Sequence, residues 1–238
     1  MNGKSLGVKE ALDHIIDWKV PFADGLNQIR VVSGDKSEQA EINFQLQPFQ
    51  FNDQIPFKDM NVLLGAKRYY IDDQLHEIWM PGQLYKKGSW GYIGGEPFKG
   101  TNNRISYGSD KNILGTENDP IYQTQQVGIK QFKFDVPDGD YDISLHFAEL
   151  IGGETKEALA YNLDNNHKTE AVENRVFSVS INETPFMEKI NLAKDFGYTR
   201  TVQKKTRITV ESGKGITIDF KAIEGKAVLN AVQLRKIY

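Results

Sequence analysis

Apolar and polar residues alternate with a period of two over most of this 238-residue chain, and turn signals divide it into short segments. Such alternation is typical of β-strands that bury one face and leave the other in solvent. The pattern therefore predicts an all-β protein built from antiparallel sandwiches.

The larger, C-terminal part of the chain is expected to hold a series of short strands. They cover residues 61–65, 122–127, 131–136, 141–150, 175–181, 184–190, 200–210, 216–221 and 227–237. Pro137-Asp138-Gly139 separates two alternating segments, which predicts a β-hairpin there. A short helix is expected near residues 191–196, ended by Gly197. Residues 82–120 and 151–173 lack strand character and are expected to form long loops.

Residues 1–48 have a different organisation. Ile16, Trp18 and Val20 alternate with polar positions, and residues 28–32 and 40–46 follow as further strands, which gives three or four in all. A sandwich of the immunoglobulin type needs about seven strands. We therefore expect residues 1–48 to be part of an immunoglobulin-like module within a longer protein, residues 49–60 to be a linker, and residues 61–238 to be a second sandwich.

Aromatic residues are concentrated in residues 69–98, which hold seven of them together with five glycines. The densest part, Gly88-Ser89-Trp90-Gly91-Tyr92-Ile93-Gly94-Gly95, predicts a bent loop rather than a regular strand. Flat ring faces suit the C–H face of a sugar, and neighbouring amides and hydroxyls suit its hydroxyl groups. The stretch therefore predicts a carbohydrate site, or else rings that cap the end of a hydrophobic core.

Composition excludes several classes of function. Charged residues make up 26% of the chain with a net charge of −3, so no broad basic surface for nucleic acid is expected. The absence of cysteine excludes disulfides, thiolate zinc sites and cysteine nucleophiles. The sequence shows neither an apolar run long enough to span a membrane nor a signal peptide, so we expect no membrane partner.

Residues that could support catalysis are few. The four histidines lack the spacing of metal ligands, so neither a metal nor a cofactor is expected. His146 alternates with Asp142 and Ser144, which allows either a proton relay or the solvent side of a half-buried strand. Glu149 is either a lone acid or a buried carboxylate that orders a loop.

A basic set near the C-terminus leaves two explanations open. Its members are Arg200, Lys204, Lys205 and Arg207. They could bind an anionic polysaccharide, or they could be the solvated face of a strand that lysines protect from edge pairing.

A set of motifs in a fixed order carries a family resemblance. The motifs are Trp79 with Gly88 to Gly95, Asp119-Pro120-Ile121-Tyr122-Gln123-Thr124, His146-Phe147-Ala148-Glu149, Arg175-Val176-Phe177-Ser178-Val179-Ser180-Ile181-Asn182 and Val228-Leu229-Asn230-Ala231-Val232. Together they resemble the malectin family of jelly-roll type β-sandwiches, in particular the module at the C-terminus of some family 2 glycoside hydrolases of the β-galactosidase type. Residues 1–48 are similar to the immunoglobulin-like module that precedes it, through residues 2–7 and 18–22.

The resemblance implies a non-catalytic carbohydrate-binding region whose catalytic domain lies upstream in the same enzyme. Its implied partners are a neutral oligo- or polysaccharide and that catalytic domain, and its implied location is the bacterial periplasm, the cell surface or the extracellular space. In malectin, aromatic residues on loops stack on a glucose disaccharide and an acid before the last strand binds its hydroxyls. Carried over, the binding residues are Trp79, Tyr85, Trp90, Tyr92, Tyr122, Gln123 and Glu224, and none is catalytic.

Two other functions remain open on the sequence. The chain could be a structural module that packs on the catalytic domain without binding sugar, in which case its aromatic residues are interface anchors. It could also be an enzyme in its own right, such as a sandwich-fold lyase or hydrolase.

Overall fold

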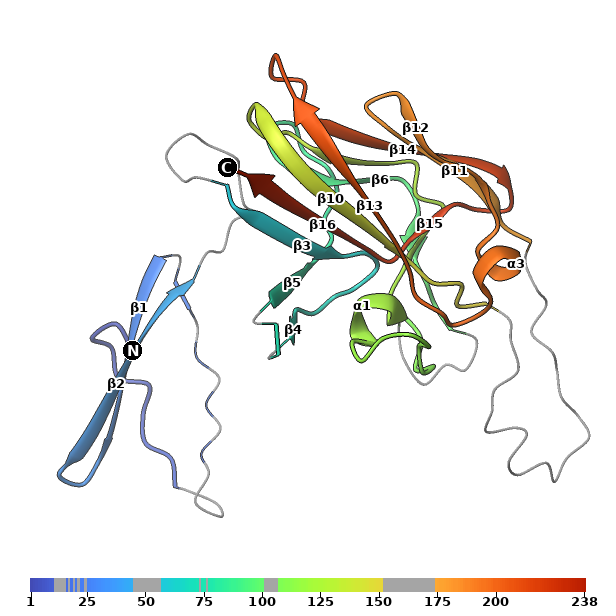
Figure 1. Cartoon of the computed structure of the whole chain (residues 1–238). Helices are drawn as coiled ribbons and strands as arrows, with labels where there is room; N and C mark the ends of the chain where they lie inside the picture. The colour runs from blue at the N-terminus through green and yellow to red at the C-terminus, as the bar shows by residue number, and fades with distance from the viewer. Residues whose placement is uncertain are drawn as a thin grey trace, which may run out of the picture. The chain divides into compact units, whose positions relative to one another are not determined.

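The computed structural model describes residues 1–10, 16, 18, 20, 22–23, 25–44, 57–72, 74–75, 77–100, 107–151 and 174–238. The chain divides into two compact units, Met1–Phe49 and Gln50–Tyr238. Strands dominate the described part of both units, which confirms the all-β fold class (Figure 1). Residues 49–56 of the expected linker and residues 152–173 of the expected long loop lie outside the described residues.

The N-terminal unit contains one antiparallel hairpin in its described part, made of β1 (Gly25–Ser33) and β2 (Lys36–Phe44). The expected strand through Ile16, Trp18 and Val20 has no strand conformation at those three positions. The immunoglobulin-like arrangement of this unit therefore stays a prediction.

The C-terminal unit is built from two large sheets and one small one. The six-stranded sheet has the order β13 (Val202–Val210), β10 (Gly139–Phe147), β16 (Ala231–Ile237), β3 (Asp59–Leu63), β5 (Glu77–Pro81) and β4 (Tyr70–Asp72). The five-stranded sheet has the order β12 (Thr184–Ile190), β11 (Val176–Ile181), β14 (Ile216–Glu224), β9 (Gln131–Phe134) and β6 (Trp90–Ile93). The small sheet has the order β15 (Val228–Leu229), β8 (Gln126–Val127) and β7 (Glu96–Pro97). All neighbouring strands are antiparallel except β3 and β5, which are parallel.

The core lies between the two large sheets. Tyr141, Ile143 and Leu145 alternate along β10 and are fully buried on its inner face. At the end of the same strand, the ring centroid of Phe147 lies 6.0 Å from that of Phe177 in β11. This contact joins the two sheets face to face, and each such buried side chain contributes about 1.5–3 kcal/mol to stability.

The predicted hairpin around Pro137-Asp138-Gly139 is wrong. β9 pairs with β14 and β6 in one sheet, whereas β10 pairs with β13 and β16 in the other. The turn therefore carries the chain from one sheet to the other. Both strands alternate because they face the same core from opposite sides, and a sequence pattern does not distinguish this crossover from a hairpin.

Two further predictions of secondary structure are corrected. Residues 90–93 of the expected bent loop form β6, which pairs along β9. Residues 122–127, expected as a strand, begin in helix α1 (Pro120–Gln123), which has proline in its first turn, and only β8 is extended. The helix expected at 191–196 is confirmed as α3 (Leu192–Phe196), capped by Asn191 and ended at Gly197.

Candidate functional site

One end of the C-terminal unit collects the loops that border both large sheets. Strand register places the end of β3, the end of β10 and the start of β16 together, and likewise the start of β11 and the end of β14. Residues 64–66, 107–125, 148–151, 174–175 and 224–230 form this end, which we call the loop end. Figure 1 shows α1 and β15 there.

A buried ion pair lies beneath the loop end. The guanidinium Nη1 of Arg175 is 3.5 Å from Oε1 of Glu149, and both side chains are 1% exposed. The same Nη1 donates to Oε1 of Gln125 at 3.3 Å, and Gln125 Nε2 donates to the Ala148 carbonyl at 2.7 Å. Glu149 also accepts a hydrogen bond from the backbone N–H of Ile151. Glu149 is therefore a buried carboxylate that orders a loop, as one of the two sequence interpretations expected.

Asn230 ties three loops to this pair. Its Oδ1 accepts from the Ala148 N–H at 2.9 Å and from Gln125 Nε2 at 3.1 Å. Its Nδ2 donates to the carbonyls of Tyr122 at 2.6 Å and Thr124 at 2.9 Å. Because the side chain is fully buried, each of these bonds replaces one that water would otherwise make. The loops before β8, after β10 and before β16 are thereby held in one arrangement.

His146 lies on the outer face of the six-stranded sheet, where it is covered by aromatic side chains. Tyr122 Oη is 2.9 Å from Nδ1 of His146. The Trp79 and His146 rings are perpendicular, with their centroids 5.4 Å apart. Gln203 Nε2 is 3.3 Å from the other ring nitrogen. Burial, assisted by the Lys205 ammonium, lowers the pKa of His146 to about 4. Burial also raises the pKa of Tyr122 to about 12, so both groups are neutral near pH 7.

The expected solvent-side position is wrong for His146, which is 4% exposed. Asp142 lies four residues before His146 on the same face of β10. It is exposed, and its Oδ1 forms an ion pair with Nε of Arg207 at 3.0 Å. The Arg207 guanidinium lowers the pKa of Asp142 through this hydrogen bond. His146 and Asp142, which a proton relay would have to connect, thus interact with different partners.

Lys204, Lys205 and Arg207 of the basic set lie on β13, an edge strand of the six-stranded sheet, whereas Arg200 precedes the strand and bridges to Leu114. Alternation places Lys205 and Arg207 on the outer face and Lys204 on the other face, where its ammonium lies 5.4 Å from the Phe196 ring centroid. Because the set is divided between two faces and Asp142 compensates Arg207, the structure favours the explanation as a solvated edge strand.

Three rings among the predicted binding residues are buried. Trp79 and Trp90 are each 2% exposed, and Tyr122 is 6% exposed. Trp79 and Tyr122 belong to one apolar cluster on the outer face of the six-stranded sheet. Trp90 is remote from them and stacks on Phe132 inside the sandwich, with ring centroids 6.3 Å apart. In this conformation none of the three presents a ring face to a ligand.

The other predicted residues are divided between two places. Tyr85 lies near the start of β6, at the opposite end of the sandwich from the loop end, where it donates to Asp135 at 2.8 Å and its ring lies under the Lys133 ammonium. Tyr92 is half-buried in the same strand. Two polar members, half-buried Gln123 and exposed Glu224, do lie at the loop end.

The two polar members have defined partners. Gln123 Nε2 donates to the Lys111 carbonyl at 3.0 Å. Glu224 accepts a hydrogen bond from Asn174, the neighbour of buried Arg175. Both side chains are therefore held by partners at the loop end.

Sequence reasoning missed Arg175, Asn230 and Tyr107. Asn230 interrupts an otherwise apolar run from 227 to 232, and such an isolated polar residue is the signal of a buried hydrogen-bonding role. Tyr107 lies outside the aromatic-rich stretch; it is half-buried, with the Lys67 ammonium 5.3 Å from its ring centroid. It lies close to Gln123 in the fold because the N–H of Ser109 donates to the Gln123 carbonyl at 2.8 Å.

Comparison with known proteins finds a matching family model and an enzyme of similar structure. A family model described as the malectin domain matches residues 57–235. A β-glucuronidase of Bacteroides uniformis is similar in structure over 100% of this chain, with a TM-score of 0.68 and 26% sequence identity. The chain covers 26% of the length of that enzyme.

Two plant proteins match a smaller share of this chain. The extracellular domain of ANXUR1 from Arabidopsis thaliana matches 76% of this chain and 42% of its own, with a TM-score of 0.52 and 11% identity, which shows a shared fold alone. The kinesin-like protein KIN-14E of Oryza sativa subsp. japonica is 26% identical over 136 residues, which is 54% of this chain and 11% of that protein.

Within the described residues, neither helix has the length and apolar character of a membrane span.

Proposed function

Because the chain belongs to the malectin domain family, whose modules are of the carbohydrate-binding type, we propose that it is the non-catalytic, glycan-recognising region of a larger glycoside hydrolase. The family match supports the class of ligand. Similarity to a β-glucuronidase over the whole chain, the N-terminal unit included, supports the larger enzyme. The β-galactosidase type expected from the sequence has no such support.

We place the glycan site at the loop end. The observation that carries this placement is the buried network of Glu149, Arg175, Gln125 and Asn230, which holds loops from both large sheets in fixed positions. A site binds its ligand more tightly when its loops are ordered before the ligand arrives, because less conformational entropy is lost on binding. The location implied by the family resemblance, outside the cytoplasm, is part of this proposal.

The proposed contacts are Glu224, Gln123 and Tyr107. Glu224 is exposed and offers carboxylate oxygens to sugar hydroxyls, and Gln123 offers an amide. The half-buried ring of Tyr107 provides an apolar face next to Gln123. Trp79 and Tyr122 support this surface from below, since both pack in the cluster beneath the segment that carries Gln123.

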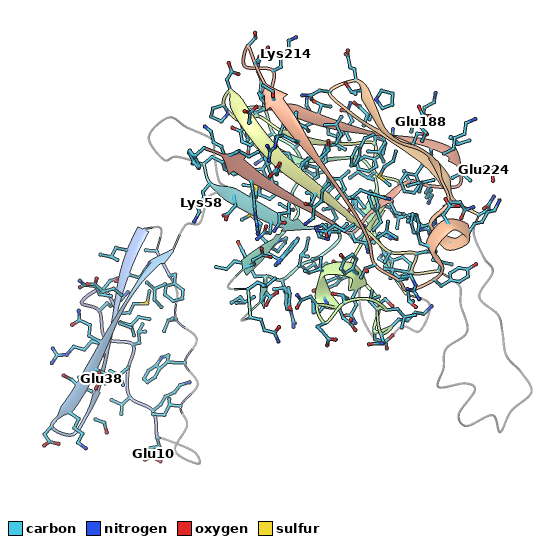
Figure 2. The ribbon with its side chains drawn as sticks, in the orientation of Figure 1. Glu10, Glu38, Lys58, Glu188, Lys214 and Glu224 are labelled. Carbon is cyan, nitrogen blue, oxygen red and sulfur yellow. The ribbon has the colours of Figure 1, made fainter. Side chains whose placement is uncertain are left out.

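Calorimetric titration of the chain with neutral gluco-, galacto- and manno-oligosaccharides tests the proposal. Glu224→Ala is expected to weaken binding about tenfold, which corresponds to the loss of one hydrogen bond to a charged group. The matched control is Glu211→Ala, in the turn before β14 at the other end of that strand. Lys214 lies in the same turn as Glu211, and Figure 2 shows Lys214 and Glu224 at opposite ends of this strand. If none of these glycans binds, the proposed function is wrong; equal loss in both variants removes the loop-end site.

A further inference from the structure

Large apolar side chains are exposed at one side of the C-terminal unit. Five of the eight exposed large hydrophobic residues in the described part of this unit fall between residues 69 and 84. They are Tyr69, Ile71, Leu75, Ile78 and Leu84, each between 57% and 66% exposed, and we call them the open side. The other three are Leu114, Ile223 and Tyr238, which are far apart in sequence. Patches of this kind on a folded domain mark contact surfaces.

Strand register shows that the open side continues the hydrophobic core. Ile71 of β4 lies directly opposite Ile78 of β5. Trp79 lies opposite Asn61 on the outer face, so Ile78 faces the inner side, as does fully buried Val62 of β3. The six-stranded sheet therefore extends beyond the five-stranded sheet that packs on its inner face. Figure 1 shows β5 and β4 at this end of the six-stranded sheet.

The second sheet contributes to the same side of the sandwich. After β5 the chain passes to the five-stranded sheet, where Leu84 forms a parallel bridge with Tyr92 of β6. Leu84 thus lies beyond the edge strand of that sheet with its side chain on the face that Tyr92 turns to the core. Inward-facing apolar side chains of both sheets are consequently left in solvent.

Cationic residues flank the open side at both ends. Lys67 and Arg68 directly precede Tyr69, and Lys86 and Lys87 follow Leu84 by two and three residues; all four are exposed. None of them has an ion-pair partner within the described part of the chain. A complementary surface would be apolar in its centre and acidic at its rim, which is the anatomy of a protein interface.

We propose that the open side docks this chain on an apolar, acid-rimmed surface of the catalytic part of the same polypeptide. The chain covers only 26% of the β-glucuronidase to which it is similar, so most of such an enzyme lies outside it. A second copy fits less well, because two copies would bring cationic rims together. A membrane also fits less well, because membrane-surface anchors are typically amphipathic helices rather than paired strands. The proposal rests on the larger-enzyme part of the proposed function and is independent of glycan binding.

Hydroxyl-radical footprinting of the chain alone and within the full glycoside hydrolase polypeptide tests this surface. Oxidation of Tyr69, Ile78 and Leu84 is expected to fall about tenfold in the full polypeptide, because the centre of an interface loses almost all contact with water. Ile223, exposed on β14, is the internal control and should keep its reactivity. Equal oxidation in both samples overturns the proposal.

Two other occupants give different results, and each overturns the proposal. Protection in the chain alone that rises with protein concentration identifies a second copy. Protection that needs vesicles of phosphatidylglycerol and phosphatidylcholine identifies a membrane.

A double variant separates docking from folding. Ile71→Ser with Ile78→Ser should leave the thermal unfolding midpoint of the chain alone nearly unchanged, because both side chains are already exposed. In the full polypeptide it should raise the oxidation of Tyr69 and Leu84 about threefold or more, since anchor residues dominate interfaces. Ile223→Ser is the matched control. The Glu224 variant should alter glycan titration without altering this footprint, so failure of docking and failure of glycan binding are distinguishable.

Discussion

Asn230 has more structural consequence than its size suggests. Its side chain makes four hydrogen bonds, two through Oδ1 and two through Nδ2. Two of its partners are the carbonyl of Tyr122 in α1 and that of Thr124 just after the helix, and a third is the N–H that follows β10. A buried backbone group without a partner is costly, so the arrangement of the loop end depends on this one amide.

Replacement of Asn230 by alanine should therefore lower the free energy of unfolding by about 3 kcal/mol, because it leaves buried backbone groups without partners. Guanidinium denaturation measures the change. The control is Asn112→Ala at an exposed position, expected within about 0.5 kcal/mol of wild type. An Asn230 variant as stable as the control would contradict the role assigned to the network.

His146 should make stability fall as the solution is acidified. Burial lowers its pKa from 6.5 to about 4, so between these values the unfolded chain binds a proton that the folded chain does not. The unfolded state then gains protons as pH falls through this window, and stability is lost with them. At about 1.4 kcal/mol per pKa unit, the full loss is about 3 kcal/mol.

The measurement is the difference between wild type and His146→Gln in unfolding free energy from pH 7 downward. Carboxylates that titrate in both proteins contribute equally to the two pH dependences, so their contribution cancels in the difference. Wild type should lose stability relative to the variant as pH falls from 6.5 toward 4. A difference that does not change with pH would show that His146 is solvated or protonated in the folded protein.

At the scale of elements, the loop after β3 is held against the segment between α1 and β8. Gly65 has a positive φ of 72°, and a Cβ built there would lie 2.2 Å from the Gln125 carbonyl oxygen. Gln125 itself binds Arg175 and Asn230. The close approach of these two backbones thus joins the loop after β3 to the buried network.

A pair of glycine substitutions isolates this contact. Gly213 has a similar φ of 66° with nothing within 4 Å of its built Cβ. Gly213→Ala should lower the unfolding free energy by about 1 kcal/mol, the backbone term alone. Gly65→Ala should lower it by about 3 kcal/mol or more, because overlap with the Gln125 backbone is added. Equal losses in thermal or chemical unfolding would mean that the loop after β3 can move away freely.

Local signals predicted some elements well and others poorly. β12 and α3 were predicted because their turns, alternation and Gly197 act within a few residues. The connection from β9 to β10 was not, because Pro137-Asp138-Gly139 is compatible with both a hairpin and a change of sheet. Pairing partners are set by contacts distant in sequence, which alternation does not encode.

The same distinction applies to the candidate site. Glycines and aromatics in 88–95 favoured a loop, yet pairing with β9 makes Trp90–Ile93 a strand and buries the indole of Trp90. A ring that packs in a core and a ring that stacks on a sugar have the same sequence signal. Gln123 and Glu224 were placed by the family resemblance, and both lie at the loop end.

At the scale of the whole molecule, the C-terminal unit has two surfaces with different chemistry. The loop end is polar and is ordered by a buried hydrogen-bond network. The open side is apolar with cationic flanks. A region that both recognises a glycan and docks on a catalytic partner needs two such surfaces, because one face serves each contact.

The most direct measurement is chemical-shift mapping of the ¹⁵N-labelled chain during titration with neutral oligosaccharides. Amide shifts should gather at the loop end, around Tyr107, Gln123 and Glu224, while residues 88–95 stay unchanged. Shifts centred on residues 88–95, or no shift with any of these glycans, would contradict the glycan site proposed at the loop end.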